Sequence, residues 1–329
     1  MTQTCLARDG AVEAARSGGP SLDVTVLMGG PSSEREVSLV SGRAIADALV
    51  RLGHKVTCGD ISPADTSALD RRDIDAVFIA LHGQFGESGE VQQLCEQRGL
   101  CYTGSGPHAS RLAMNKVLAC ERFRKAGLLC PRGLHVHADR PAATYRSALK
   151  ALGLPAVIKP VDGGSSVDLT IARDEASRQA AMEMVLGKYG QALVEQYVAG
   201  MEVTVGILGE QALPALRIIP AREFYDYVAK YADDAGTRYE FDLGVSSQTV
   251  EALQRAALRA HQALGCRDMS RVDFILSGDG RPLLLELNTI PGFTGHSLLP
   301  MAAARAGLSF DQLVGRLLEM AMVRRASRR

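Results

Sequence analysis

Residues Val24-Thr25-Val26-Leu27-Met28 form an almost wholly apolar run that stops at Gly29-Gly30-Pro31. A strand of this kind is covered on both faces, as in a parallel sheet flanked by helices. A helical pattern follows, with Ser38 as its expected cap and Gly53 as its end. Its apolar face holds Leu39, Ile45, Leu49 and Leu52. A second apolar strand occupies residues 77–81, and the alternation continues to about residue 110. The pattern predicts an open parallel α/β unit.

Length and composition limit the class of protein. The chain has 329 residues, with 37 Lys and Arg against 37 Asp and Glu, so we expect two or three domains and no nucleic-acid partner. No apolar run reaches the ~18 residues that cross a bilayer, and residues 1–20 lack a signal-peptide core. The 7 cysteines form no C-x-x-C pair, which is typical of reduced thiols. We therefore expect a cytoplasmic protein with no membrane partner.

The rest of the chain has a mixed α+β texture. Residues 1–20 predict a flexible extension, and the basic segment 324–329 is interpreted as a solvated terminus rather than a binding patch. Strand patterns cover residues 156–159, 192–196 and 202–208, and helical patterns cover residues 115–126, 247–264 and 310–322. Residues 224–243 show no clear period, which predicts a long loop.

Two strand patterns, residues 271–276 and 283–288, flank Ser277-Gly278-Asp279-Gly280, which predicts a β-hairpin. Because side chains alternate along a strand, Val272 and Phe274 face the core while Arg271 and Asp273 face the other way.

The outward face of this hairpin carries acidic groups. Glu286 and Asn288 share a face, and strand pairing can bring Glu286 beside Asp273. Two adjacent carboxylates repel each other unless a positive group lies between them. Oxygen ligands at this density suit Mg²⁺ or Mn²⁺ rather than zinc. The alternative is a solvated polar face with Arg271 as the counter-ion.

The loop Asp162-Gly163-Gly164-Ser165-Ser166 follows a strand that ends in Lys159. Glycines let backbone N–H groups approach phosphate oxygens, serines add donors, and Lys159 adds positive charge. The loop does not match the G-x-x-x-x-G-K-[ST] pattern, so a P-loop is not supported. A plain tight turn is the alternative.

Polar residues also follow the apolar strands. His82 lies at the end of a buried strand, where ligands bind in α/β sheets. It either contributes to such a site or is a core histidine whose ring nitrogens have hydrogen-bond partners. Glu34 follows the first glycine turn and either holds a substrate ammonium or is a helix-start charge. The loop 225–231 holds three tyrosines and Lys230, which predicts a lid that excludes water. Aromatic packing under the loop is its alternative.

Together these segments resemble the D-alanine–D-alanine ligases of the ATP-grasp superfamily. Each segment is short, but nine occur in the family's order between about Val24 and Leu317. The segments are residues 29–38, 81–83, 102–106, 159–160 with 164–166, 202–205, 225–231, 271–274, 286–292 and 296–298.

The resemblance implies a three-domain ATP-grasp fold with an N-terminal open parallel α/β domain. The implied parts are an extension (1–20), an N-terminal α/β substrate domain (21–107), a central domain (108–199) and a C-terminal domain (200–329). ATP would lie between the central and C-terminal domains. The resemblance also implies a homodimer.

The resemblance implies a reaction as well. ATP phosphorylates the carboxylate of one D-alanine, the amine of a second D-alanine attacks the acyl phosphate, and phosphate leaves. The product, D-alanyl-D-alanine, serves peptidoglycan synthesis. Both steps build negative charge on oxygens, which two Mg²⁺ or Mn²⁺ ions and fixed cations stabilise. Tyr231 favours an amine acceptor. The alternatives are an acceptor such as D-serine or D-lactate, or a catalytically weakened nucleotide-binding relative.

Site residues follow from position in the matched segments. The residues that match nucleotide contacts are Lys116, Lys159, Ser166, Glu195, Val198, Glu202 and Lys230. The metal ligands are Asp273, Glu286 and Asn288. The catalytic residues are Glu34, Ser165, Tyr231 and Arg271. The substrate residues are Glu34, His82, Arg271, Gly292, Ser297 and Leu298.

Asp168 departs from the family pattern, which usually has glycine at this place in the loop. If the Asp168 carboxylate faces bound phosphates, repulsion costs about 1 kcal/mol or more of nucleotide binding. If it faces solvent, it costs little. Ser88 also departs, since the family usually has Asp there. Neither departure removes an expected metal ligand.

Overall fold

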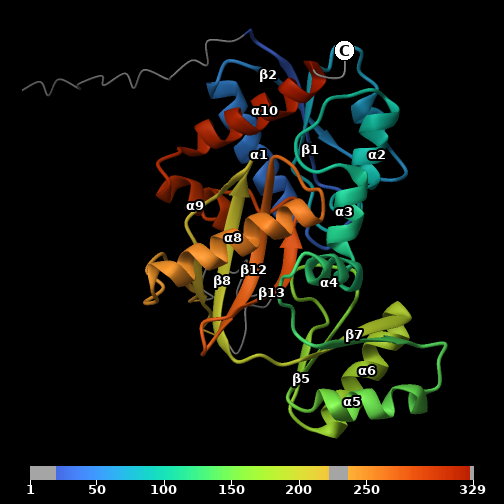
Figure 1. The fold of residues 1–329 in the computed structure, drawn as a ribbon. Coiled ribbons are helices and arrows are strands. Elements are labelled where there is room, and N and C mark those ends of the chain that lie inside the picture. Colours follow the sequence, from blue (N-terminus) through green and yellow to red (C-terminus); the bar gives the residue numbers. More distant parts are fainter. Residues whose placement is uncertain (1–19, 222–235, 327–329) are drawn as a thin grey trace, which may run out of the picture.

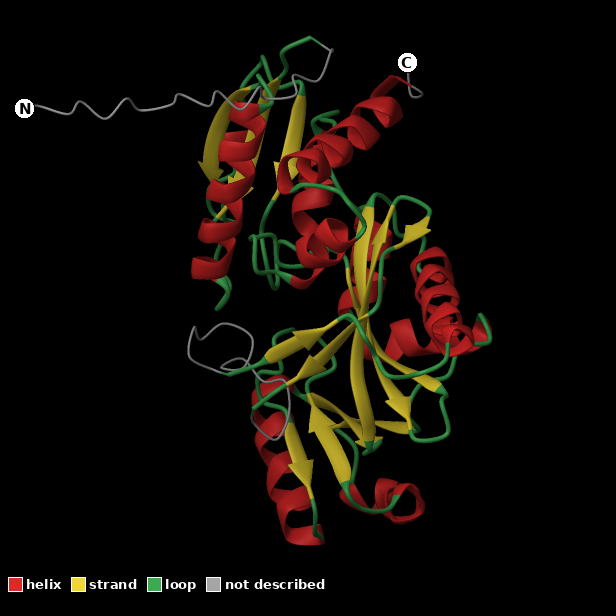
Figure 2. Cartoon of the chain, turned by 90° about the vertical axis from the view of Figure 1, so that its left-hand side faces the viewer, coloured by secondary structure: helices red, strands yellow, loops and turns green. Residues whose placement is uncertain are grey.

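The structure is a computed structural model that describes residues 20–221 and 236–326. Its described part contains three sheets, one in each of the three units that the resemblance implied. In both views the C-terminal sheet lies between an N-terminal α/β unit and a central unit (Figures 1 and 2). None of the helices in the described ranges is both long and apolar enough to cross a membrane.

The N-terminal unit is built on a parallel sheet of order β2-β1-β3. Its elements are β1 (Asp23–Met28), α1 (Arg35–Arg51), β2 (Lys55–Asp60), a 3-10 turn (Ser67–Leu69), β3 (Ala76–Ile79), α2 (Glu90–Gln97) and α3 (Pro107–Met114). The sequence prediction of a parallel α/β unit is confirmed. The predicted cap is wrong, because α1 begins at Arg35 and Ser38 lies inside it. Ser38 is buried, and its hydroxyl donates to the Ala80 carbonyl over 2.8 Å.

The central unit carries an antiparallel sheet of order β4-β7-β5-β6. Its elements are α4 (Lys116–Lys125), β4 (Gly133–His137), a 3-10 turn (Ala142–Tyr145), α5 (Arg146–Leu152), β5 (Ala156–Lys159), β6 (Thr170–Ala172), α6 (Glu175–Tyr189) and β7 (Gln191–Gln196). A capping box between Asp174 and Ser177 fixes the start of α6. Gly190, in the left-handed conformation at φ 72°, ends it.

The C-terminal sheet has the order β11-β10-β8-β12-β13, with β9 on β8. Its elements are β8 (Gly200–Leu208), β9 (Gln211–Ala212), β10 (Leu216–Ile219), β11 (Arg238–Glu240), α8 (Ser247–Ala263), β12 (Met269–Ser277) and β13 (Pro282–Asn288). The sequence analysis predicted a loop over residues 224–243. That prediction is wrong for strand β11, whose residues pair with β10. The helices α9 (Leu298–Arg305) and α10 (Phe310–Ala326) complete the described chain.

The apolar cores do not follow chain order. The core under β1 and β3 also contains Leu299, Leu313 and Leu317 from α9 and α10, so the end of the chain packs on its beginning. Phe123 of α4 packs with Val272 and other residues of the C-terminal sheet. Shared cores of this kind tie the units together, and the boundaries at residues 107 and 199 stay a prediction.

The basic C-terminal segment is not simply solvated. Arg324 forms an ion pair with Asp268 and donates to the Tyr102 carbonyl over 2.8 Å. Arg325 pairs with Asp75 at 3.2 Å. The Asp268 side chain is 3% exposed and also accepts from the Gly104 backbone N–H over 2.8 Å. The solvated-terminus interpretation is therefore wrong for Arg324 and Arg325, while residues 327–329 lie outside the described range.

Replacing Asp268 by asparagine tests this link. Asp268 has φ 62°, which asparagine tolerates, so the variant removes charge without adding backbone strain. Loss of hydrogen bonds to a charged group should lower the free energy of unfolding by about 2 kcal/mol. Chemical denaturation measures the change. Asp139→Asn, at an exposed site, is the control and should stay within about 0.5 kcal/mol of wild type. Equal stability of Asp268→Asn and wild type would contradict the role of this link.

Candidate active site

A pocket lies between the central and C-terminal sheets. Its lining includes all the described residues that the sequence analysis assigned as nucleotide contacts. Those residues are Lys116, Lys159, Ser166, Glu195, Val198 and Glu202. Asp273 and Glu286 of the hairpin also line it. The pocket therefore combines cations for phosphate groups with carboxylates for metal ions in one space.

Two lysines, Lys159, which is buried, and Lys116, whose side chain is 12% exposed, carry positive charge in this pocket. Lys159 Nζ lies 2.5 Å from Glu195 Oε2, and the two side chains are 9% and 8% exposed. Burial by itself lowers the pKa of Lys159, but the Glu195 carboxylate more than offsets this, so the pKa is raised. Burial dominates at Lys116 and lowers its pKa, although Glu286 lies 3.8 Å away and opposes the shift.

Local structure explains why Lys116 faces the pocket. Asn115 caps α4, since its side-chain oxygen accepts from the Leu118 backbone N–H over 3.0 Å. The Lys116 backbone N–H donates to the Val161 carbonyl over 3.0 Å. The first turn of α4 is thereby fixed to the chain just after β5, which carries Lys159. The sequence prediction of a helix from about Asn115 is confirmed.

In the β12–β13 hairpin Asp273 lies directly opposite Glu286, which confirms the predicted pairing, and a register shift between Asp273 and Phe274 produces this alignment. Arg271 holds Asp273 by two hydrogen bonds of 3.0 and 2.8 Å. The Thr204 hydroxyl donates to Asp273 over 2.6 Å. Thr204 was not expected in the site, although it is a lone polar residue in the buried run 203–208. Val272 and Phe274 are fully buried on the other face.

The hairpin groups fit a hard divalent cation. Asp273 and Glu286 supply carboxylate oxygens, and Asn288, whose Nδ2 lies 3.3 Å from Asp273 Oδ2, adds an amide oxygen. Within residues 20–221 and 236–326, no three His, Cys, Asp or Glu side chains gather as a metal site. The set here is instead two carboxylates and one amide, and all-oxygen donors suit Mg²⁺ or Mn²⁺.

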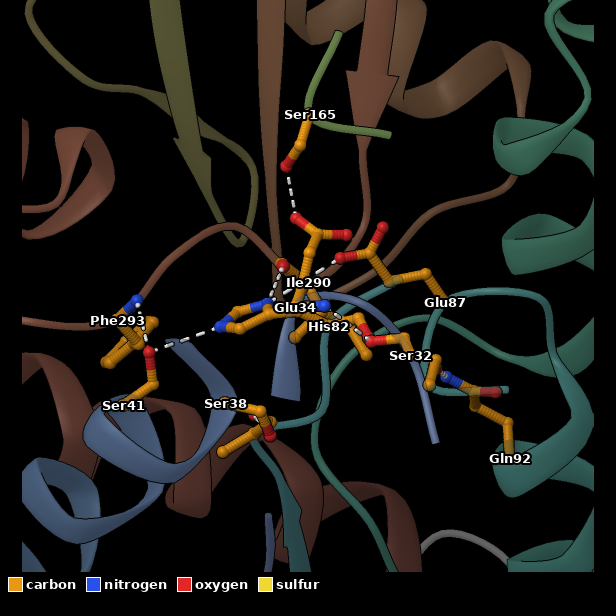
Figure 3. Close-up of polar contacts among 12 residues, drawn as sticks. Ser32, Glu34, Ser38, Ser41, His82, Glu87, Gln92, Ser165, Ile290 and Phe293 are labelled. Carbon is orange, nitrogen blue, oxygen red and sulfur yellow. Dashed lines mark hydrogen bonds and ion pairs between the residues drawn. The ribbon is translucent and has the colours of Figure 1, made fainter. Parts of the chain in front are cut away.

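A second cluster surrounds Glu34 (Figure 3). Glu34 is the N-cap residue of α1, yet its side chain makes no capping hydrogen bond. The Ser165 hydroxyl of the glycine-serine loop donates to the Glu34 carboxylate instead. Gly83 gives this carboxylate room, because a Cβ there would lie 2.9 Å from Glu34 Oε2. The arrangement buries a carboxylate where the N-terminal unit meets the loop.

His82 is held on both ring nitrogens (Figure 3). Nε2 lies 3.1 Å from the Ser41 hydroxyl, and Nδ1 lies 3.2 Å from the Ile290 carbonyl oxygen. A carbonyl only accepts, so Nδ1 carries a proton. The alternative of a core histidine with satisfied nitrogens is confirmed, while a role of His82 toward a ligand stays a prediction.

Glu87 also belongs to this cluster, and the sequence analysis did not single it out as a site residue. Its carboxylate lies 3.7 Å from His82 Nδ1 and its side chain is 14% exposed. Burial raises the pKa of Glu87; the neighbouring Glu34 raises it further, and His82 and Arg271 oppose the shift. The signal available in the sequence was a carboxylate in a glycine turn, Gly86-Glu87-Ser88-Gly89, just after His82.

The residues expected for a second amino-acid substrate lie after β13. Ser297 precedes α9, and its hydroxyl accepts from the Thr294 backbone N–H over 2.9 Å. A Cβ on Gly292 would lie 3.1 Å from Ser297 Oγ, so this glycine allows the close approach. Leu298 is buried and packs on Leu216 and Ile218 of β10. Lys230 and Tyr231 lie outside the described residues, and their assignment stays a prediction.

Asp168 takes neither of the two orientations considered from the sequence. Its carboxylate accepts hydrogen bonds from Lys188 Nζ, over 2.7 Å, and from the Tyr189 hydroxyl. These hydrogen bonds lower the pKa of Asp168. The neighbouring residues Ser166, Val167 and Leu169 line the pocket, and Asp168 is not among the lining residues.

Comparisons with known proteins match the chain to a family model, to curated relatives and to solved structures. The family described as "D-ala D-ala ligase C-terminus" matches residues 134–319. The chain is 43% identical to the D-alanine–D-alanine ligase of Gloeobacter violaceus, over 91% of this chain and 99% of that protein. It resembles the Bacillus anthracis D-alanine–D-alanine ligase solved in complex with ATP, with TM-score 0.82, 31% identity, and coverage of 94% and 100%. It also resembles the VanG D-Ala:D-Ser ligase of Enterococcus faecalis, with TM-score 0.81, 26% identity, and coverage of 92% and 100%.

A double-mutant cycle on Lys159 and Glu195 measures how far the pocket depends on their ion pair. Either Lys159→Met or Glu195→Gln leaves one buried charge uncompensated and should cost about 3 kcal/mol of folding free energy in the ligand-free protein. The double variant should lose clearly less than the sum of the two. Chemical denaturation without nucleotide gives all four values. Strictly additive losses would show that the two charges do not stabilise each other.

Glu87→Gln tests the burial of that carboxylate. Because the folded-state pKa of Glu87 is raised above the ordinary value of 4.5, Glu87 stabilises the fold below that value and the stabilisation is lost as pH rises. The glutamine variant lacks this titration. Its stability relative to wild type should therefore increase as the pH rises above about 4.5. Thermal unfolding across pH measures the difference, and a difference constant with pH would refute the buried-carboxylate interpretation.

Proposed function

The chain belongs to the D-alanine–D-alanine ligase family, and we propose that it uses ATP to join two D-alanines into D-alanyl-D-alanine for peptidoglycan synthesis. The reaction releases ADP and phosphate. The observation that carries the proposal is the Ser165–Glu34 hydrogen bond. It joins the loop that borders the nucleotide pocket to a buried carboxylate suited to an amino-acid ammonium.

The nucleotide pocket supplies fixed positive charge. Lys116 and Lys159 line it, and their side chains are only 12% and 9% exposed, so their attraction to phosphate oxygens is weakly screened. The glycines at 163 and 164 and Ser166 also line it, and glycine lets backbone N–H groups approach an anion closely. These groups would hold the triphosphate in one place before the reaction, so little reorganisation remains during it.

Glu34 and its neighbours would orient the first D-alanine. The Glu34 carboxylate attracts the substrate ammonium, and the hydrogen bond from Ser165 sets the direction of that carboxylate. His82 is fixed between Ser41 and Ile290, so it shapes the wall of this cluster without moving. With its ammonium at Glu34, the substrate can direct its carboxylate toward the hairpin and the nucleotide.

The hairpin would stabilise the negative charge that develops during the reaction. The Arg271 side chain is only 13% exposed. A guanidinium shielded from water near the phosphoryl acceptor stabilises an oxyanion more strongly than a fully hydrated guanidinium does. Asp273, Glu286 and Asn288 would hold Mg²⁺ or Mn²⁺, which when bound supplies positive charge to the phosphate oxygens. Gly292, Ser297 and Leu298 would hold the second D-alanine, and Lys230 and Tyr231 would cover the site from the undescribed segment.

We also propose that the enzyme acts in the cytoplasm as a homodimer. The described cysteines, Cys58, Cys95, Cys101, Cys120, Cys130 and Cys266, are all free thiols, which supports a reducing compartment. The homodimer rests on the family resemblance alone. The boundaries of the extension and three domains, at residues 20, 107 and 199, are proposed on the same ground.

Phosphate release from ATP and Mg²⁺ tests the reaction, with D-alanine, L-alanine, D-serine and D-lactate compared and the product identified by mass. We expect release that depends on D-alanine and a product with the mass of the dipeptide. A mixed product with D-serine or D-lactate as the preferred acceptor would replace the main proposal by the alternative ligase. Folded protein that releases no phosphate with any substrate would favour a weakened nucleotide-binding relative.

Removing a proposed metal ligand should remove turnover and leave the fold intact. Asp273→Ala and Glu286→Ala should each lower kcat by at least ~10²–10³-fold, because charge stabilisation in the transition state is lost. Asp279→Asn, at an exposed position in the turn of the same hairpin, is the control and should keep wild-type turnover. Circular dichroism checks the fold of each variant. Near-normal turnover in either alanine variant would disprove the metal assignment.

A further inference from the structure

The glycine-serine loop adopts an unusual backbone conformation. Ser165, Ser166 and Asp168 have φ of 53°, 56° and 55°. Residues with a Cβ rarely occupy this left-handed region, and a chain keeps such residues there only where surrounding contacts hold them. The loop therefore needs anchors.

The described contacts place an anchor at each end of this stretch. Ser165 donates to Glu34 of the N-terminal unit. Asp168 accepts from Lys188 and Tyr189, the last two residues of α6. Between and beside these anchors, Ser166, Val167 and Leu169 line the nucleotide pocket. The side chains thus divide into two groups, one holding the loop and one facing the nucleotide.

The corner where α6 turns into β7 is arranged to receive the loop. Lys188 Nζ lies 5.2 Å from the centre of the Tyr189 ring, so the two donors lie side by side. Gln191, the first residue of β7, donates to Asp162 over 3.2 Å. Residues 188–191 therefore hold the Asp162 carboxylate at the beginning of the loop and the Asp168 carboxylate near its end. Asp168 also has its charge balanced there, and it is not among the residues that line the pocket.

We propose that Asp168 is a positioning residue that clamps the loop of residues 163–169 onto Lys188 and Tyr189, in the conformation that presents the loop to the phosphates of ATP. This inference rests on the proposed function and deepens it. The clamp acts through Ser166 and the loop backbone on the nucleotide, and through Ser165 on Glu34. It gives the acidic residue a favourable role in nucleotide binding instead of a cost.

The two roles predict opposite results for Asp168→Gly. Glycine adopts positive φ without strain, so the variant removes the carboxylate and leaves the backbone conformation accessible. If Asp168 clamps the loop, the dissociation constant of a non-hydrolysable ATP analogue with Mg²⁺ should rise about three- to tenfold. If Asp168 only repels phosphate, the analogue should bind more tightly. Titration calorimetry without D-alanine decides between them, and unchanged or tighter binding overturns the proposal.

Changes on α6 test the clamp from its other side. The double variant Lys188→Met with Tyr189→Phe leaves the loop sequence intact and should weaken analogue binding by about as much as Asp168→Gly. The single variant Lys188→Arg keeps a cationic donor and should therefore retain most of the wild-type affinity for the analogue. Lys150→Met, at an exposed position on α5 of the same unit, is the matched control and should bind as wild type. Wild-type affinity in the double variant would overturn the proposal.

Steady-state kinetics separate positioning from a general loss of stability. Asp168 and Lys188 are 22% and 57% exposed, so breaking their ion pair should barely change the unfolding temperature of the ligand-free protein. The KM for ATP should rise nonetheless. A lowered unfolding temperature with an unchanged KM would show a structural role and overturn the proposal. If the wild-type enzyme forms no dipeptide, the proposed function fails, but the analogue titrations still decide whether the clamp exists.

Discussion

Charge buried between the central and C-terminal sheets has to be balanced inside the protein, and the pocket is organised around that requirement. Lys159 pairs with Glu195, and Lys116 lies close to Glu286. A similar pairing holds Asp273, which accepts two hydrogen bonds from a neighbouring guanidinium. An unpaired ion in such a place costs several kcal/mol. The cations proposed to hold ATP are therefore paired with carboxylates in the ligand-free protein, and nucleotide binding would exchange one set of partners for another.

The same requirement explains why the site needs three units. Glu34 is the N-cap residue of α1, its hydrogen-bond donor Ser165 lies on a loop of the central unit, and the guanidinium of Arg271 lies on the C-terminal hairpin. The N-terminal and central units contribute their groups from helix starts, a strand end and a loop, where side chains and backbone N–H groups are exposed. The C-terminal unit contributes Arg271, Asp273 and Glu286 from within β12 and β13. The α9–α10 segment packs on the core of β1 and β3, so the beginning and the end of the chain are held together around this junction.

Local patterns predicted the parts of the site that lie on a single element. Strand alternation predicted that Asp273 and Glu286 could share a face, but their direct pairing depends on a register shift between Asp273 and Phe274, without which Leu285 would lie opposite Asp273. Predictions failed where a distant partner decides. Ser38 looks like a helix cap, but the Ala80 carbonyl accepts from its hydroxyl inside α1. Arg324 looks like part of a solvated tail, but Asp268 binds it. Strand β11 forms because β10 offers it an edge, which no period in its own three residues reveals.

The sequence by itself determined which chemical groups the protein carries, their spacing along each helix and strand, and through its motifs the family. It did not determine which groups meet across long stretches of chain. Ser165 lies 131 positions from Glu34, and the sequence left the orientation of Asp168 open between the phosphates and solvent. The tertiary structure directs that carboxylate to Lys188 and Tyr189. The physical reason is that backbone periodicity fixes the face on which a side chain lies, whereas its partner depends on how separate sheets and helices pack to bury their apolar surfaces.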